Sequence, residues 1–168
     1  MTTLHLGVED IPYSWGGTSS PAKARKTAGA RQGGAAKARS AKPDTTTTGE
    51  VAEILEAKYR VMFLFTEEYP DEIANAVANG YAGAMETVMM GGPVPADPLA
   101  GAASEIEESF KYFLSSAEIE GFGVAGVPTQ AALDGVNHRL KIKKGPRRPS
   151  FIDTGLYQAS FKAWFVYR

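Results

Sequence analysis

An Asp-Thr-Gly run at 153–155, preceded by two apolar residues, has the pattern of the catalytic loop of aspartic proteases. In those enzymes two such loops face each other and their two carboxylates share one proton. A β domain must also continue beyond the loop, whereas only residues 156–168 follow here, and Leu156 stands where a small residue is usual. We therefore expect Asp153 not to be catalytic, and expect Asp153 or Thr154 to cap a short helix instead.

Few residues of this chain are suited to other kinds of catalysis. Cysteine is absent, which excludes disulfides, thiolate metal sites and a cysteine nucleophile. The two histidines, His5 and His138, have no carboxylate at metal-ligand or triad spacing, and the glycine run at 121–126 is not a complete phosphate-binding pattern. Three acids are expected to form a solvated helix face rather than a metal site: Glu105, Glu107 and Glu108. We predict no catalytic residue, no metal and no cofactor.

The charges are separated along the chain, although the net charge is only −1. Residues 49–120 are mainly acidic, while the chain from Asp134 onward is basic. The stretch 21–42 has no acid and carries Lys23, Arg25, Lys26, Arg31, Lys37, Arg39 and Lys42. A second basic run supplies Lys143, Lys144, Arg147 and Arg148. Blocks of one sign indicate partners rather than fold, and we predict that these residues contact a protein partner or DNA.

The basic stretch lies in a low-complexity segment, 16–48, made only of small and polar residues. No side chain there can anchor a core, so residues 1–46 are predicted to be an extended N-terminal arm that becomes ordered on binding. Tyr13 and Trp15 are either part of a frayed terminus or aromatic anchors in a neighbouring subunit. The arm itself has three readings: a clamp on a protein neighbour, a contact with nucleic acid, or a solubility tail.

Helical patterns dominate the next part of the chain. Thr47 and Glu50 form a capping box for a helix reaching about Thr66. A second helix is predicted from Pro70 to the Gly-Gly-Pro at 91–93, with one apolar stripe along its length. Ser104 can cap a third helix, and Thr129 a short turn. No apolar stretch approaches 18 residues and no leader pattern is present, so we expect neither membrane insertion nor secretion.

The C-terminal part has the composition of strands. Residues 138–144 alternate apolar and basic side chains, and residues 161–168 are rich in aromatic residues. The reversal at 153–160 would allow these two segments to pair. The predicted fold class is α+β, a domain over residues 47–168 with a helical N-terminal half and a small antiparallel sheet near the C-terminus, preceded by the extended arm.

Residues 148–165, RPSFIDTGLYQASFKAWF, resemble the C-terminal signature of head-tail joining and tail-completion proteins of tailed bacteriophages. In that group a proline-containing loop leads into Asp-Thr-Gly, a nearby Leu, a Ser or Thr that ends the turn, and a closing strand. The matching residues here are Pro149, Asp153, Thr154, Gly155, Leu156 and Ser160. The sequence departs from the commoner pattern because Leu156 follows Gly155 directly.

This resemblance implies a small α+β subunit without catalytic activity. Such proteins assemble as rings, commonly hexamers or dodecamers, between portal or adaptor proteins and the tail. The expected place is the neck or tail of the virion, reached from the host cytoplasm during assembly, with non-specific contact to packaged DNA as a further possibility. The alternatives are a baseplate or tail-tube initiator subunit and a nucleic-acid-binding protein that uses its basic arm.

Overall fold

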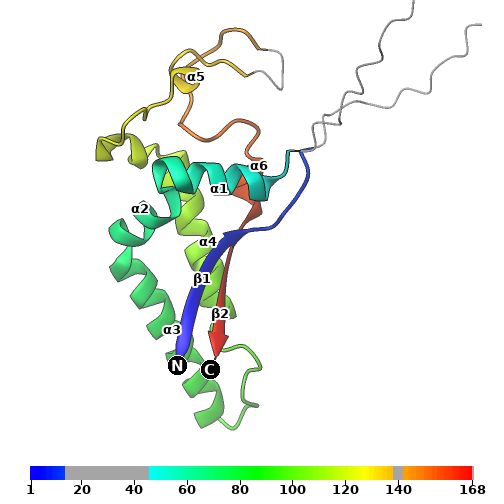
Figure 1. Ribbon diagram of the computed structural model, residues 1–168. Coiled ribbons are helices and arrows are strands. Elements are labelled where there is room, and N and C mark those ends of the chain that lie inside the picture. The colour runs from blue at the N-terminus through cyan, green and yellow to red at the C-terminus, as the bar shows by residue number, and fades with distance from the viewer. Residues whose placement is uncertain (14–45, 138–141, 168) are drawn as a thin grey trace, which may run out of the picture.

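The computed structural model describes residues 1–13, 46–137 and 142–167 of the chain. Within these residues a helical body packs against a two-stranded antiparallel sheet, so the predicted α+β class is confirmed (Figure 1). No helix in the described part is long and apolar enough to cross a membrane.

The first predicted helix is two helices that meet at Arg60. The predicted capping box of Thr47 and Glu50 is present and begins α1 (Thr48–Tyr59). Arg60 then adopts a left-handed φ of 54°, and α2 (Val61–Glu68) begins directly after it. The Glu56 carboxylate accepts hydrogen bonds from the first backbone N–H groups of α2, at 2.8 Å from Met62 and 3.2 Å from Phe63. This local cap stabilises the break that sequence periodicity does not reveal.

The next two helices pack together along their lengths. As predicted, α3 (Pro70–Met89) has Pro70 in its first turn. By contrast, the predicted cap of the third helix is wrong, because α4 (Ala100–Ser115) begins four residues before Ser104. Ser104 lies inside the helix, and its hydroxyl donates to the Ala100 carbonyl. An added Cβ at Gly80 would lie 3.2 Å from the Pro98 carbonyl oxygen. Glycine at this position therefore lets the loop before α4 approach the backbone of α3.

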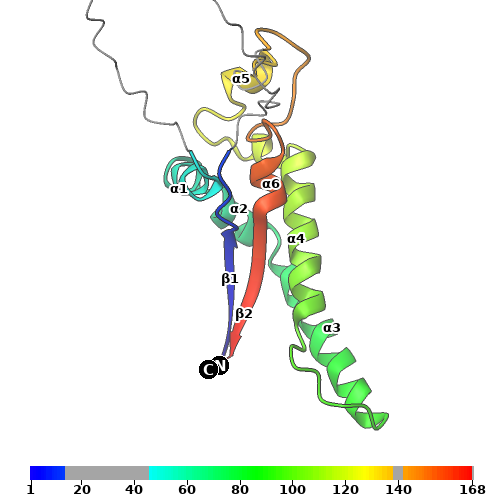
Figure 2. The ribbon, with the colours of Figure 1, turned by 90° about the vertical axis from the view of Figure 1, so that its right-hand side faces the viewer.

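The sheet pairs the two ends of the described chain. β1 (Thr2–Val8) runs antiparallel to β2 (Phe161–Tyr167), with Leu4 opposite Phe165 and Leu6 opposite Ala163 (Figures 1 and 2). The predicted partner of the closing strand, residues 138–144, is therefore wrong. Of that segment, residues 138–141 lie outside the described residues, and Ile142 forms only an isolated bridge with Asn137.

Aromatic side chains fill the centre of the molecule. Phe110 of α4 stacks on Phe161 of β2, with 3.8 Å between ring centroids, and Phe65 of α2 meets the Phe110 ring edge-on. All three rings are fully buried. The inner face of β1 adds its three aliphatic side chains to this core: Leu4, Leu6 and Val8. Burial of this face ties the N-terminal strand to the helices.

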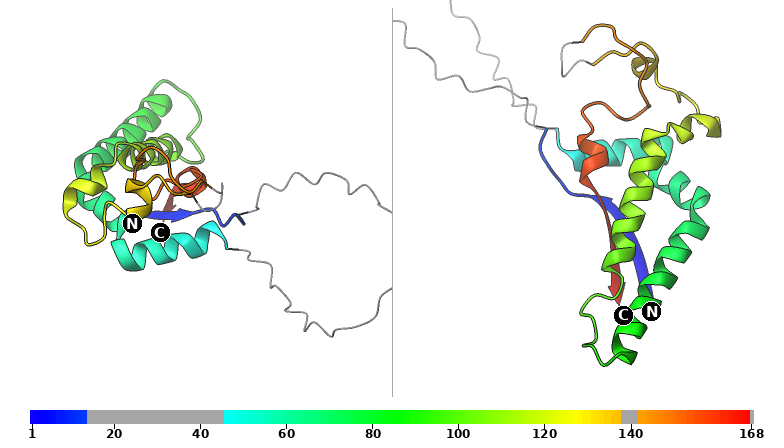
Figure 3. Two further views of the ribbon diagram at one scale, coloured as in Figure 1. Left: turned by 90° about the horizontal axis from the view of Figure 1, so that it is seen from above. Right: turned by 180° about the vertical axis from the view of Figure 1, so that it is seen from behind.

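Three short helices lie at the end of the molecule that also holds α1 (Figure 3): η1 (Glu118–Phe122), α5 (Gln130–Leu133) and α6 (Leu156–Ser160). Thr129 caps α5 as predicted, accepting from the Ala132 N–H. The predicted caps of α6 are wrong. Gly155 occupies the N-cap position with a φ of 76°, and no side chain caps this helix. The Thr154 hydroxyl accepts only a 3.5 Å contact from the Leu156 N–H.

Residues on either side of the low-complexity segment are bound to each other. The Tyr13 N–H donates to the Thr46 carbonyl at 3.0 Å, and Pro12 bridges Thr47. The described residues that flank the segment 14–45 therefore meet at one place on the body. Together with β1, this corrects the predicted arm over 1–46, because its first thirteen residues belong to the folded body. Trp15 and the seven basic residues of 21–42 lie outside the described residues.

Candidate assembly surface

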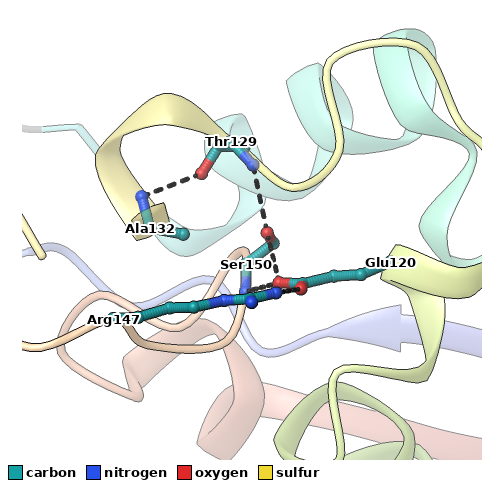
Figure 4. A network of polar contacts seen from close by, with 5 residues as sticks. All are labelled: Glu120, Thr129, Ala132, Arg147 and Ser150. Carbon is teal, nitrogen blue, oxygen red and sulfur yellow. Dashed lines mark hydrogen bonds and ion pairs between the residues drawn. The ribbon is translucent and has the colours of Figure 1, made fainter. Parts of the chain in front are cut away.

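The loop that precedes the Asp-Thr-Gly run is held by one carboxylate. Glu120 accepts from the Ser150 N–H at 3.1 Å and from the Ser150 hydroxyl at 2.9 Å, and it pairs with Arg147 at 2.5 Å (Figure 4). The same hydroxyl oxygen accepts from the Thr129 N–H at 3.2 Å. Segments around 120, 129 and 150 are thus joined at the buried Ser150 side chain.

The electrostatics of this network favour an ionised glutamate. Burial alone would raise the pKa of the Glu120 carboxyl, but hydrogen bonds from Ser150 and Arg147 outweigh burial and hold the pKa below its usual value. Arg147 was predicted to contact DNA or a partner. Its side chain is exposed, yet its guanidinium is engaged with Glu120, which leaves it less available for an external phosphate.

Arg148 has an internal role that differs from the predicted one. Its guanidinium donates to the backbone carbonyls of Ile152 and Val136, and it forms an ion pair with Asp153 at 3.3 Å. These contacts close the loop around Phe151, which has a left-handed φ of 67°. Arg148 and Asp153 therefore stabilise the reversal before α6, and the structure does not support Arg148 as an outward DNA or partner contact.

The remaining motif residues lead directly into β2. Tyr157 is buried, and the buried Ser160 hydroxyl donates to the Tyr157 carbonyl at 2.9 Å. The Ser160 carbonyl accepts from the Glu9 N–H at 2.7 Å, so the last residue of the motif starts the pairing with the N-terminal strand. Pro149 and Leu156 are partly buried, and Thr154 is exposed. The run at 149–160 thus forms the loop, the short helix α6 and the connection into β2.

The described part of the second basic run lies on a tightly built loop. Lys143 and Lys144 are exposed, consistent with an outward contact. Gly135 has a φ of 61°, and an added Cβ there would lie 2.4 Å from the Pro146 carbonyl oxygen. The two sides of this loop therefore meet backbone to backbone, and only glycine at 135 permits that approach.

An apolar groove at the end of α3 was not expected from the sequence. The sequence predicts one apolar stripe along this helix, and only the first part of the stripe, including Ile73 and Val77, packs on the core. Met85 is 64% exposed and Met89 is 84% exposed. A groove of about 360 Å³ runs between α3 and the following loop, lined by Tyr81, Ala84, Met85, Val88, Met89, Val94, Pro95 and Pro98. Met90, next in the chain, is also exposed.

The groove lies where α3 extends past the ends of the two strands (Figure 2). The sequence signal that could have revealed it is the Met-rich run at 85–90 followed by the turn-rich segment 91–98, which provides too few apolar residues to cover the stripe. Contiguous exposed apolar surface of this kind is typical of interaction sites. Methionine is common at such surfaces because its flexible thioether adapts to a partner.

The described residues contain no group of three or more His, Cys, Asp or Glu side chains placed to hold a metal ion. A scan against protein-family models and searches of curated proteins and of solved structures found no match to this chain.

Proposed function

We propose that the protein is a structural subunit of the neck of a tailed bacteriophage, a tail-completion or head-tail connector protein that assembles as a ring between portal or adaptor and tail proteins. The observation that carries this proposal is the fold of residues 148–165. They form a closed loop, a single helical turn and a closing strand in direct succession. This is the arrangement that the motif resemblance implies for a connector subunit.

Two further features support an assembly role. The apolar groove along α3 offers a surface that a neighbouring subunit can cover. The segment 14–45 is attached at both ends to the body by the contacts of Tyr13 and Thr46. A long polar excursion fixed in this way can cross to an adjacent subunit without loosening the fold. Both features fit a subunit held by its neighbours on several sides.

The rival function is a DNA-coating protein, for which the exposed Lys143 and Lys144 are the described evidence. Arg147 and Arg148 contribute less to that surface because they are engaged internally. A DNA-coating protein should bind duplex DNA tightly at low salt and lose affinity steeply as salt rises. For a connector we expect weak binding by the isolated chain, measured by fluorescence anisotropy at two salt concentrations.

The genetic test is disruption of the coding sequence in the phage, followed by electron microscopy of the lysate. A connector subunit is required to join two preformed parts, so the expected result is separate heads and tails with no increase in aberrant DNA packaging. Complementation with the wild-type chain should restore joined particles. Intact infectious particles from the disrupted phage would overturn the proposal.

A further inference from the structure

β1 has an open backbone edge, whereas the outer edge of β2 is protected. In an antiparallel pair, alternate residues direct their backbone groups toward the partner strand and away from it. The Glu9 N–H reaches the Ser160 carbonyl across the sheet, so Gly7, His5 and Thr3, which alternate with it, also face β2. The even-numbered residues between Thr2 and Val8 therefore direct their N–H and C=O groups outward.

The outer edge of β2 is closed by a side chain from α4. The Glu107 carboxylate accepts from the outward-facing Ala163 N–H at 3.2 Å and pairs with Lys162 at 3.3 Å. At the far end of this strand the Tyr167 hydroxyl donates to Asp97 at 2.9 Å. Charged groups placed against an edge in this way prevent another strand from pairing with it.

The edge of β1 has no comparable protection among the described residues. None of them forms a hydrogen bond with the outward backbone groups of Leu4, Leu6 or Val8. Figure 2 shows no element beside β1 on the side away from β2, below the level of α1. The strand also contains no Asp, Glu, Lys or Arg from Thr2 to Val8. It is thus a seven-residue edge without acidic, lysine or arginine side chains that is available for pairing.

We propose that this edge pairs with β1 of a second copy of the chain, antiparallel about a two-fold axis at His5. The segment 16–45 has no aliphatic or aromatic β-former to alternate with the β1 pattern, and β2 of a second copy is blocked by Glu107. Of the two described strands, only β1 therefore offers a free edge. The two-fold at His5 is the register that pairs all seven residues, with Leu4 opposite Leu6 of the other copy.

This pairing adds two strands to each sheet and extends its apolar inner face across the two copies. The absence of Asp, Glu, Lys and Arg from β1 means that no repulsion between such side chains opposes the contact. The inference goes beyond the connector proposal, because a two-fold pair describes the free protein and does not require a ring.

The test uses the absence of native cysteine in the full chain. With the axis at His5, the two copies of residue 5 form a pair without mutual backbone hydrogen bonds, about 4.5 Å apart at Cα, which suits a disulfide. His5→Cys is therefore expected to give a covalent dimer on mild oxidation. Thr3→Cys is the matched control, because the two copies of residue 3 are offset by about 14 Å in this register. It should remain uncrosslinked.

A second pair of variants measures association without crosslinking. His5→Lys places two like charges directly opposite each other and should lower the dimer association constant roughly two- to fivefold in sedimentation equilibrium. Thr3→Lys faces Gly7 of the other copy and should change it less. A wild-type chain that stays monomeric at high micromolar concentration overturns the proposal. Crosslinking by Thr3→Cys as readily as by His5→Cys overturns it too. Neither result bears on whether the protein is found in virions.

Discussion

The N-terminal strand is expected to stabilise the fold substantially, whereas the segment 14–45 is not. Deleting residues 1–8 removes the only described partner of β2 and three aliphatic side chains that pack on the core. A fully buried aliphatic side chain contributes about 1.5–3 kcal/mol. Because Leu4, Leu6 and Val8 are each partly buried, we take half of that range and expect a loss of about 3 kcal/mol.

A loss of this size is a large share of the stability of a single domain, which is about 5–15 kcal/mol. The melting temperature should fall by roughly 10 °C, given a shift of a few degrees per kcal/mol at this chain length. The partner variant replaces residues 14–45 with a linker of about four residues between Tyr13 and Thr46, which are already hydrogen-bonded. Shortening the loop about eightfold should stabilise the fold by roughly 2 kcal/mol.

Both variants are compared with the full chain by far-ultraviolet circular dichroism melts and urea titration. The expected order of stability is the linker variant at or above the full chain, and the variant without residues 1–8 well below it. If deletion of residues 1–8 leaves the melt unchanged, the pairing of β1 with β2 does not stabilise the fold. If the linker variant loses its helical signal, residues 14–45 form part of the core and the interpretation of this segment is refuted.

Two side-chain predictions concern the loops around the motif. Gly135→Ala should destabilise the fold by about 3 kcal/mol, because its Cβ would meet the Pro146 carbonyl at a φ of 61°; Gly123→Ala, at a φ of 65° with open space, should cost only about 1 kcal/mol in urea titration. Glu120→Gln should cost about 1–3 kcal/mol at pH 7, and exposed Glu108→Gln almost nothing. Since the folded-state pKa of Glu120 is lowered, the Glu120→Gln deficit is present above the ordinary value of 4.5 and should shrink as pH falls below it. Equal costs for the two glycine variants, or a Glu120→Gln deficit independent of pH, would contradict these contacts.

Local signals predicted much of the helical part of this fold. The capping box at Thr47, the proline at the start of α3 and the cap at Thr129 act within a few residues, so they can be recognised in the sequence. The break at Arg60 could not be recognised in this way, because it depends on the Glu56 carboxylate accepting a hydrogen bond from the backbone of the next helix. The start of α4 has no side-chain cap that could be recognised in the sequence, and the loop before it packs against Gly80 of α3.

The strand pairing could not be predicted correctly, because the two paired strands are far apart in the sequence. Alternation at Leu4, Leu6 and Val8 is a strand signal, but its partner lies at the other end of the chain, and a nearer candidate at 138–144 has a similar pattern. For the candidate surface, residue type alone could not show that Arg148 points inward while Lys144 points outward. The apolar stripe of α3 was visible, whereas its exposure depends on where the helix extends past its neighbours.

The central claim is that the chain is a ring component of the phage neck. The most direct measurement is quantitative mass spectrometry of purified virions, comparing the copy number of this chain with that of the major capsid protein. A closed ring predicts a fixed number near six or twelve per particle. Absence of the chain from purified virions would contradict the claim, and a copy number that varies with DNA content would indicate a DNA-coating protein instead.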